Sequence, residues 1–435
     1  MTADENLVPT KETMIRVRRL PYVVPSPEAL QVTGVDLASL DDPAHPDEYE
    51  AMGRVYKEMK VHWTRQRTFL GFNSFKYDEQ LLRHSLWRCL LDPYATSGKA
   101  SSRVDLQALV QMAKYGSSGS IATILNGDGK PSFRLESLCQ ANGIPIQAHD
   151  ALHDAKATLD LGALVRGNVR WAWDLAVAAG NPATVDGLMA QAHREKRVMW
   201  MFSHFGEPDV MPCLPLGTDS RKRWIVADLR TDVDAIGETA KLSELAYGKA
   251  APFRVVRAAS APYFVDVGTA DRIAPGCVNA QVAVRADAVR GNAELARRAV
   301  ELLTAVEDWE NHADATSDER IYGGFPSNAD KSAMTSFHAA SWDDRVEIRF
   351  EDPRLRDFAG RLIVMAERQG LVDSARVGNH WREASAAAFR RPFDAEGSRW
   401  PTLAQIRAGG MPDAWRTWAE EAFSTSLEEA APAVP

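Results

Sequence analysis

The apolar residues of this chain change their spacing twice, which divides it into three zones. Up to about residue 179, apolar residues at helical spacing alternate with short apolar runs, a pattern that favours an α/β domain. The stretch 116–129 is rich in Gly, Ser and Asn and indicates a surface loop. The pattern predicts strands at 14–18 and 67–72 and helices at 47–60, 77–88, 135–142, 150–165 and 169–179.

The second and third zones follow a charged run at 193–197. Short apolar or alternating runs at 198–202, 223–229 and 253–257 predict a small, mostly β domain, and helical spacing returns at 291–309, 354–369 and 381–389. We therefore predict three domains, at 1–178 (α/β), 195–285 (β) and 286–425 (helical).

Composition narrows the class of protein. Hydrophobic residues make up 45% and charged residues 25% of the 435 residues, which is typical of a globular protein with a sizeable core. The formal net charge of -8 argues against a surface that is basic throughout, although Arg221–Arg223 offers a local basic patch. The four cysteines stand far apart, no apolar run approaches the roughly 18 residues of a membrane helix, and no signal peptide is visible. We expect a cytoplasmic protein with reduced thiols and no membrane contact.

The run Ala148–Ala155 carries the most informative candidate chemistry. Its His149 stands five residues before Asp154 and just ahead of a helical pattern, so a proton acceptor lies beside a carboxylate. Taken alone, the pair is also typical of a helix-capping carboxylate with a surface histidine. Two companion motifs stand upstream, at Gly71–Asp78 and at Pro131–Leu138.

In this order the motifs resemble those of the bacterial exonuclease I family, whose members are 3′→5′ exonucleases of single-stranded DNA. The resemblance extends over nearly the whole chain, through 92–95, 102–106, 141–144, 321–325 and 328–330. Several linked motifs in the right order make chance agreement a poor explanation. The resemblance implies an α/β fold class with three parts: a ribonuclease H-like exonuclease domain, an SH3-like β domain and a C-terminal helical domain.

The resemblance also implies the chemistry of the site. Family members hydrolyse phosphodiesters with two divalent cations, which in such sites lie about 3.5–4 Å apart. Mg²⁺ is the expected ion, with Mn²⁺ as a plausible substitute, because such hard cations prefer carboxylate oxygens and water. By resemblance, Asp78 and Asp154 are metal ligands and His149 is the general base that takes a proton from the attacking water.

Five further residues are candidates for substrate binding: Asn73, Phe75, Lys76, Phe133 and Arg134. Active-site loops favour the place between a strand end and a helix start, where Phe75 could stack on a base and Lys76 could meet a phosphate. A core phenylalanine and a solvated lysine are the alternative. By resemblance Arg134 contacts the DNA backbone, while the alternative is a surface ion pair with Glu136 or Asp128.

The sequence departs from the family pattern at its beginning. The family's first motif, Asp-x-Glu on the opening strand, should precede Met1 by a few tens of residues, so two carboxylates and one strand are expected to be missing here. Three explanations stay open: a misplaced start, a truncated relative, or carboxylates supplied by a partner chain. We accordingly expect weak activity or none from the chain as it stands. A second departure is the stretch 201–224, which is shorter than usual for the β domain.

The sequence thus predicts an exodeoxyribonuclease that degrades single-stranded DNA to mononucleotides, with a role in DNA repair or recombination. One alternative is a relative that binds single strands but has lost catalysis. Another is an enzyme of the same superfamily that acts on RNA ends. The expected partners are single-stranded DNA and a single-stranded DNA-binding protein, and the expected state is a monomer.

Overall fold

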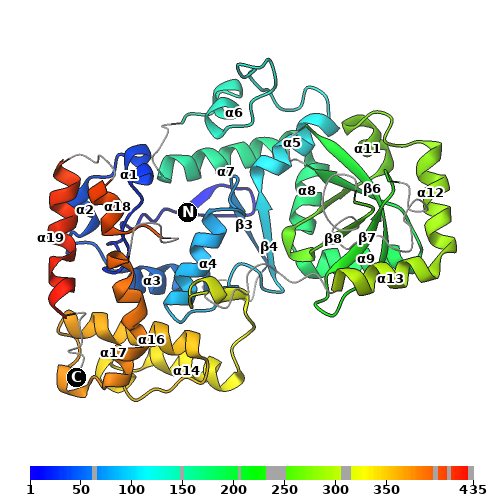
Figure 1. Cartoon of the computed structure of the whole chain (residues 1–435). Coiled ribbons are helices and arrows are strands. Elements are labelled where there is room, and N and C mark those ends of the chain that lie inside the picture. Colours follow the sequence, from blue (N-terminus) through cyan, green and yellow to red (C-terminus); the bar gives the residue numbers. More distant parts are fainter. Residues whose placement is uncertain are drawn as a thin grey trace. The chain divides into compact units, whose positions relative to one another are not determined.

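The computed structural model describes residues 1–60, 66–146, 151–203, 207–231, 251–304, 315–394, 400–408 and 413–429 (Figure 1). Backbone contacts group the chain into two compact units. Unit 1 consists of Met1–Thr13, His62–Glu79 and Tyr94–Asp308, and unit 2 of Met14–Val61, Gln80–Pro93 and Trp309–Pro435. Each unit therefore draws on segments that are far apart in the sequence. The domain boundaries predicted from the sequence stay predictions.

The α/β part of unit 1 contains two small sheets. Strands β1 (Thr2–Ala3) and β2 (Pro9–Lys11) form an antiparallel pair. Strands β3 (Arg67–Gly71) and β4 (Ser101–Asp105) are parallel, and their register runs from Arg67 opposite Ser101 to Gly71 opposite Asp105. Every residue of β4 is buried, whereas β3 is partly exposed. Helices follow at α5 (Leu106–Gly116), α6 (Leu135–Ala141), α7 (Ala151–Asn168), α8 (Arg170–Ala179) and α9 (Pro182–Arg194).

A close backbone contact joins α8 to β4. The amide of Arg103 donates a hydrogen bond to the carbonyl of Gly180, which ends α8, at 3.1 Å. A Cβ atom at residue 180 would lie 2.2 Å from the Arg103 carbonyl oxygen, so only glycine fits there. The buried apolar residues of α5, α6, α7 and α8 pack with β4 into one core.

The rest of unit 1 is built on a five-stranded antiparallel sheet with the order β8-β7-β6-β5-β9. Its strands are β5 (Met199–Ser203), β6 (Asp209–Thr218), β7 (Trp224–Asp228), β8 (Phe253–Val256) and β9 (Tyr263–Val265). Alternate residues face opposite sides, as strand geometry requires. Met211, Cys213 and Val226 pack with α9, while Leu214, Ile225 and Ala227 pack with helices α12 and α13. The flanking helices are η1 (Ala258–Ser260), α11 (Val267–Ile273), α12 (Ala280–Gly291) and α13 (Ala293–Thr304).

Unit 2 is helical. Its core gathers large aromatic side chains from distant segments, among them Trp87, Phe337, Phe358 and Trp381. Helix α4 (Asp78–Arg88) begins in unit 1 and continues into unit 2. The other helices are α1 (Pro27–Thr33), α2 (Leu37–Leu40), α3 (Glu48–Lys60), η2 (Glu319–Tyr322), α14 (Asn328–Ala339), α15 (Trp342–Arg345), α16 (Pro353–Arg368), η3 (Ser374–Arg376), α17 (Asn379–Arg390), η4 (Arg391–Phe393), α18 (Leu403–Ala408) and α19 (Asp413–Glu429).

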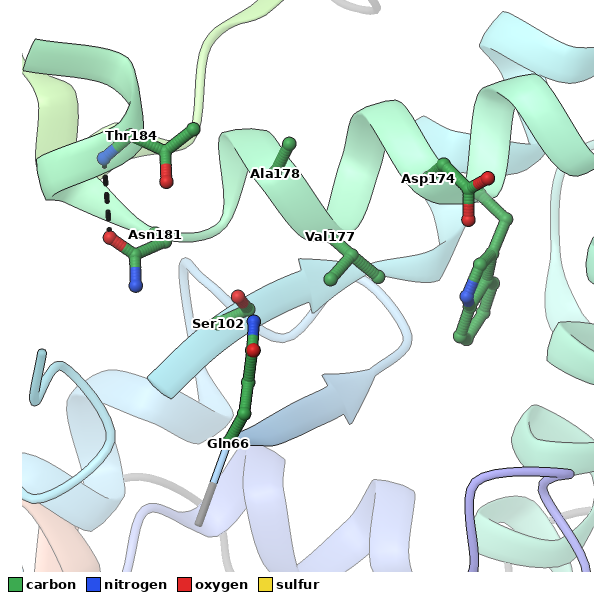
Figure 2. A pocket seen from close by; sticks show the side chains of 8 residues that line it. Gln66, Ser102, Asp174, Val177, Ala178, Asn181 and Thr184 are labelled. Carbon is green, nitrogen blue, oxygen red and sulfur yellow. Dashed lines mark hydrogen bonds between the residues drawn. The ribbon is translucent and has the colours of Figure 1, made fainter. Parts of the chain in front are cut away.

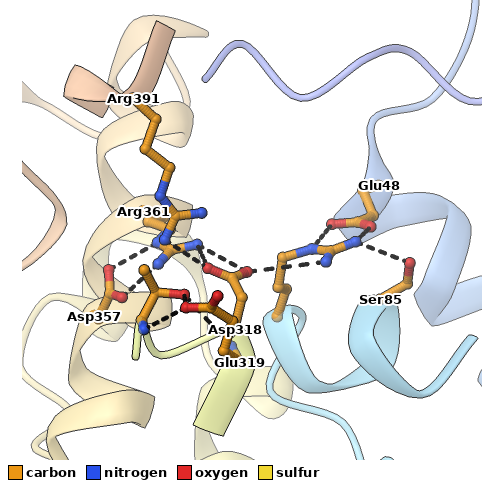
Figure 3. Close-up of polar contacts among 9 residues, drawn as sticks. Glu48, Ser85, Asp318, Glu319, Asp357, Arg361 and Arg391 are labelled. Atoms are coloured by element: carbon orange, nitrogen blue, oxygen red, sulfur yellow. Dashed lines mark hydrogen bonds and ion pairs between the residues drawn. The ribbon is translucent and has the colours of Figure 1, made fainter. Parts of the chain in front are cut away.

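A buried ion network inside unit 2 centres on Asp318 (Figure 3). Its carboxylate accepts hydrogen bonds from Arg361 at 2.9 Å and from Arg391 at 2.8 Å, and Arg88 lies 3.9 Å away. Arg88 pairs in turn with Glu48, and Arg361 pairs with Asp357. The network therefore ties the start of α3, the end of α4, α16 and η4 together through side chains that are largely removed from water.

The structure confirms most predicted elements of the first zone and corrects one. The strand predicted at 14–18 is wrong: this segment has no regular structure, and the amides of Arg18 and Arg19 bond to the carbonyls of Pro46 and Leu40. Several elements were not predicted, among them β4, α5, α9, β6 and β9. Asn181 and Pro182 are a capping residue followed by a first-turn proline, which was the available signal for α9.

Candidate functional site

The candidate site lies where β3 and β4 end. Because the two strands are parallel and in register, Gly71 and Asp105 stand side by side at the same edge of the sheet. The chain leaves β3 at Gly71, turns through residues 72–77 and enters α4 at Asp78. The carboxyl edge of a parallel sheet is where α/β proteins usually bind ligands. The residues Asn73 to Asp78, which we call the 73–78 loop, are therefore placed by the two strands.

The 73–78 loop begins with a tight turn. A Cβ atom on Gly71 would lie 2.3 Å from the Ser74 hydroxyl, so the turn requires glycine at 71. Asn73 has a left-handed backbone with φ of 52°, a conformation that asparagine tolerates better than most residues. The Glu79 amide donates to the Ser74 carbonyl at 2.9 Å, which closes the other end of the turn.

Asp105 holds the loop against the sheet. Its Oδ1 accepts hydrogen bonds from the amide of Asn73 at 2.8 Å and from the amide of Gln107 at 3.1 Å. The second bond makes Asp105 the N-cap of α5, whereas the first reaches across to the 73–78 loop. Burial raises the pKa of this carboxyl, and nearby amides, including those of Asn73 and Gln107, oppose the shift because they favour the charged form.

Asp78 is the second carboxylate at this edge. It is the first residue of α4 and is more than one-third exposed. Partial burial raises its pKa, and the negative charge of Asp105 raises it further. The two carboxylates are thus close enough to influence each other. Carboxyl groups with perturbed pKa values are often found at functional sites.

Arg103 lies two residues before Asp105 on the same strand. Its Nη1 donates to Glu79 Oε2 at 2.5 Å, and both side chains are more than nine-tenths buried. Its Nη2 donates to the carbonyl of Ala259, and its guanidinium carbon lies 5.1 Å from the centre of the Phe75 ring. Phe75 is half-buried, and the Thr96 hydroxyl donates to the other Glu79 oxygen at 2.8 Å. Neither Arg103 nor Asp105 was assigned a site role from the sequence.

Asp154 lies in the first turn of α7, where the sequence predicted a carboxylate at a helix start. Its Oδ1 is buried, and its charge contributes to a raised pKa of Cys139 on α6, after the larger effect of burial. His149 lies outside the described residues. Within the described residues, no three His, Cys, Asp or Glu side chains gather closely enough to hold a metal ion. The described residues alone therefore do not complete a two-metal site.

The remaining candidates lie in different settings. Lys76 is exposed at the turn before α4, and Arg134 is exposed at the N-cap position of α6. Among the described residues Arg134 forms no ion pair, so the alternative of a bridge to Glu136 or Asp128 does not hold. Phe133 is half-buried against Tyr115, with ring centres 5.9 Å apart. In the basic patch predicted at 221–223, Arg223 is buried and paired with Asp219 at 2.6 Å, so it is not available to bind DNA.

A small open pocket of about 270 Å³ lies elsewhere in unit 1 (Figure 2). It is lined by Gln66 just before β3, by Ser102 on β4, and by residues of α8 and the start of α9 such as Val177 and Thr184. These positions are near the beginnings of β3 and β4, whereas Asp105 and the 73–78 loop are at their ends. The pocket is therefore separate from the candidate site.

Comparison with known proteins identifies the relatives of this chain. No family model matches it. It is 27% identical to exodeoxyribonuclease I of Escherichia coli (strain K12) over 391 residues, which cover 81% of this chain and 79% of the relative. It is 31% identical over 166 residues to exodeoxyribonuclease I of Haemophilus influenzae, covering 38% of this chain and 34% of that protein. The chain is thus similar in sequence to exodeoxyribonuclease I over most of its length.

Solved structures of exonuclease I show the same fold. The structure of E. coli exonuclease I in complex with a dA16 oligonucleotide has a TM-score of 0.75 at 23% sequence identity, and it covers 99% of this chain and 94% of that chain. A structure of the ExoI/SSB-Ct complex likewise covers 99% of this chain and 94% of that one. The likeness confirms the predicted fold class, a ribonuclease H-like exonuclease domain with SH3-like and C-terminal helical domains. No helix in the described part of the chain is both long and apolar enough to cross a bilayer.

Proposed function

We propose that this chain is a 3′→5′ exonuclease that degrades single-stranded DNA to mononucleotides. The observation that carries the proposal is the alignment with an exodeoxyribonuclease I over 391 residues, because it extends far beyond any single motif. Asp78 and Asp105, at the carboxyl edge of the β3–β4 sheet, support it, because carboxylate oxygens are the ligands with which a divalent cation would be held against the phosphate. DNA repair or recombination is the expected setting, and the cytoplasm and a monomeric state stay predictions.

Dependence on a divalent metal ion is typical of this family, and we propose Mg²⁺ as the ion, with Mn²⁺ able to replace it. When bound, such an ion neutralises charge on the phosphate and lowers the pKa of a bound water. Asp78 and Asp154 would supply two of its oxygen ligands. His149 would accept a proton from the attacking water, since an imidazole titrates near neutral pH.

The proposed roles of the substrate-binding residues follow from their exposure and charge. Lys76 and Arg134 are exposed cations and would contact phosphates, which fixes the strand without reading its sequence. Phe75 and Asn73 lie in the loop beside Asp78, where the half-buried ring would meet the terminal base. Phe133 packs on Tyr115, so its contribution would be to support the backbone before Arg134.

A second partner is proposed from the solved structures. Exonuclease I forms the ExoI/SSB-Ct complex, and a further structure describes SSB/exonuclease I with an inhibitor. We propose that this chain also binds the C-terminal tail of a single-stranded DNA-binding protein. Titration of a labelled tail peptide with the full chain measures this, and the same peptide with its sequence scrambled is the control.

The function is tested with single strands labelled at one end. The purified chain with Mg²⁺ should release labelled mononucleotide first from a 3′-labelled strand and only late from a 5′-labelled strand, and this order should hold even at the weak activity expected from the sequence. Asp78→Asn and Asp154→Asn should each lower turnover by at least about 10²-fold, because each removes a carboxylate that would hold the metal ion, whose positive charge stabilises the transition state. Asp343→Asn, which alters an exposed ion pair on α15, is the matched control and should leave turnover unchanged.

Two results would contradict the proposal. Tight binding of single strands without cleavage in Mg²⁺ or Mn²⁺ would favour a binding protein that has lost catalysis. Equal or faster degradation of an RNA strand of the same sequence would favour an enzyme that acts on RNA ends.

A further inference from the structure

Arg103 occupies a place where a charged side chain is unexpected. It is the middle residue of β4, whose five residues are all buried, and only 4% of its surface is exposed. Its two terminal nitrogens bond to Glu79 and to the Ala259 carbonyl. Its Nε is buried and has no hydrogen-bond partner within the described residues. Arg103 therefore stays in the core although one of its donors is unsatisfied.

Stability alone does not account for this arrangement. Taking two charges out of water has a free-energy cost that often exceeds their attraction, and apolar residues of similar size are commonly as stable or more stable in such places. The unsatisfied Nε adds to that cost. An ion pair differs from an apolar pair because its hydrogen bonds are directional and fix the two partners in one geometry.

The contacts of Arg103 lead to both sides of the proposed site. Glu79 is the neighbour of Asp78 in the first turn of α4, so fixing Glu79 also fixes the backbone that carries Asp78. The Arg103 guanidinium faces the ring of Phe75, in the middle of the 73–78 loop. Asp105, on the same side of β4, holds the amide of Asn73 at the start of the loop. One buried strand thereby anchors the loop at its beginning, middle and end.

We propose that Arg103, acting through Glu79 and Phe75, is a positioning residue for the nuclease site, holding the 73–78 loop in the geometry that hydrolysis requires. The proposal rests on the proposed function. Arg103 is buried, so it would contact neither DNA nor the reacting atoms. Its effect on turnover is indirect, since a displacement of about 1 Å in a catalytic group can lower the rate by about 10²-fold.

The decisive variant is the double substitution Arg103→Met with Glu79→Gln. It removes both charges together, so neither is left buried without its partner, and the amide oxygen of the new glutamine would still accept the Thr96 hydroxyl. Val226→Ala is the matched control: Val226 is a fully buried apolar residue of β7, so its truncation lowers the melting temperature without touching the loop. Both variants are made in the full chain and compared with the unaltered protein.

Two quantities are measured. The first is turnover of 3′-labelled single strands, with DNA affinity measured separately. In the double variant turnover should fall by about 10²-fold, with a smaller loss of affinity because phosphate contacts are spread along the strand. The second is amide hydrogen exchange of peptides covering 72–79, which should speed up by roughly ten-fold or more, as expected where local opening becomes easier. Val226→Ala should change neither.

The outcomes separate this inference from the proposed function. A folded double variant with normal turnover, or one whose turnover falls while residues 72–79 exchange as before, overturns the positioning role. If the unaltered chain has no nuclease activity but the double variant still exchanges faster at 72–79, the proposed function fails and the anchoring of the loop by Arg103 is supported.

Discussion

Asp318→Asn is expected to destabilise unit 2 strongly, because it removes one charge from the centre of a buried network. The carboxylate of Asp318 faces three arginines, two of which it bonds directly (Figure 3). Glu48 balances Arg88 and Asp357 balances Arg361. Asp318 is therefore the carboxylate that pairs with Arg391, and asparagine of the same shape would leave one positive charge uncompensated.

The size of the destabilisation expected for Asp318→Asn follows from the burial of Asp318 and Arg391. The Asp318 and Arg391 side chains are 17% and 15% exposed, so solvent screens them only partly. Breaking a buried pair by removing one partner typically costs about 3–5 kcal/mol. For a folding unit of roughly 150–250 residues, each kcal/mol lowers the melting temperature by about 2–4 °C, so a fall of roughly 6–20 °C is expected.

The destabilisation caused by Asp318→Asn should change with pH in one direction. Burial alone would raise the pKa of Asp318, but Arg361, Arg391 and Arg88 outweigh it and hold the pKa well below its ordinary value. A carboxyl with a lowered pKa in the folded state stabilises the fold fully above its ordinary value of about 3.9, and this stabilisation is lost as the pH falls below that value. The difference between Asp318→Asn and the unaltered chain should therefore be constant from about pH 5 to pH 8 and shrink in acid.

Thermal unfolding followed by circular dichroism, from about pH 8 down to about pH 3, is the assay. Asp343→Asn is the control in the same unit, since its ion pair with Arg376 is about half exposed and should contribute less than about 1 kcal/mol. If the two variants melt together, or if the effect of Asp318→Asn grows on acidification, the charge of Asp318 does not stabilise the fold through this network.

Three further predictions concern single positions. Arg134→Ala should weaken binding to single strands of different sequence about equally and reduce the salt dependence of affinity by about one counterion, whereas unequal losses would indicate base contacts. His149→Ala should lower turnover by roughly 10²–10⁴-fold with little loss of affinity, and near-normal turnover would remove it from the mechanism. Gly180→Ala should destabilise unit 1 by at least about 1–3 kcal/mol in a urea titration, because the new Cβ would meet the Arg103 backbone. The control Gly187→Ala has open space around it and should be neutral or slightly stabilising.

The helices and strands of the first zone could be predicted because local signals agreed with the fold. The predicted helices at 47–60 and 77–88 match α3 and α4 within two residues at each end. The predicted strand at 67–72 matches β3. The strand predicted at 14–18 failed because alternation alone does not supply a pairing partner, and this segment bonds to the chain near Leu40 and Pro46 instead.

Strand β6 shows why the elements of the second, β-rich zone were harder to predict from the sequence. It is the longest and the central strand of its sheet, yet it contains Pro212 and Pro215. Proline lacks the amide that a central strand donates, so the sequence argues against a strand there. The structure accommodates one of the two with an irregularity in the pairing between Pro215 and Gly217.

The candidate site was predictable in its exposed parts and less so in its buried ones. The motif at Gly71–Asp78 located the loop, and the order of motifs located Asp154 at the start of α7. The sequence did not reveal which side chains hold the 73–78 loop in place. Arg103 and Glu79 are 24 residues apart and meet only in the folded chain.

A signal for the buried parts nonetheless existed in β4. Its sequence, Ser-Ser-Arg-Val-Asp, puts two charged residues into a strand that lies between two helical segments and must be buried. The sequence of a buried parallel strand is normally a continuous run of apolar residues. Residues whose type does not suit their place in the fold tend to lie at functional positions. Arg103 and Asp105 are the two conflicting residues, and both contact the 73–78 loop, which is why the positioning role is assigned to β4 and not to the better exposed β3.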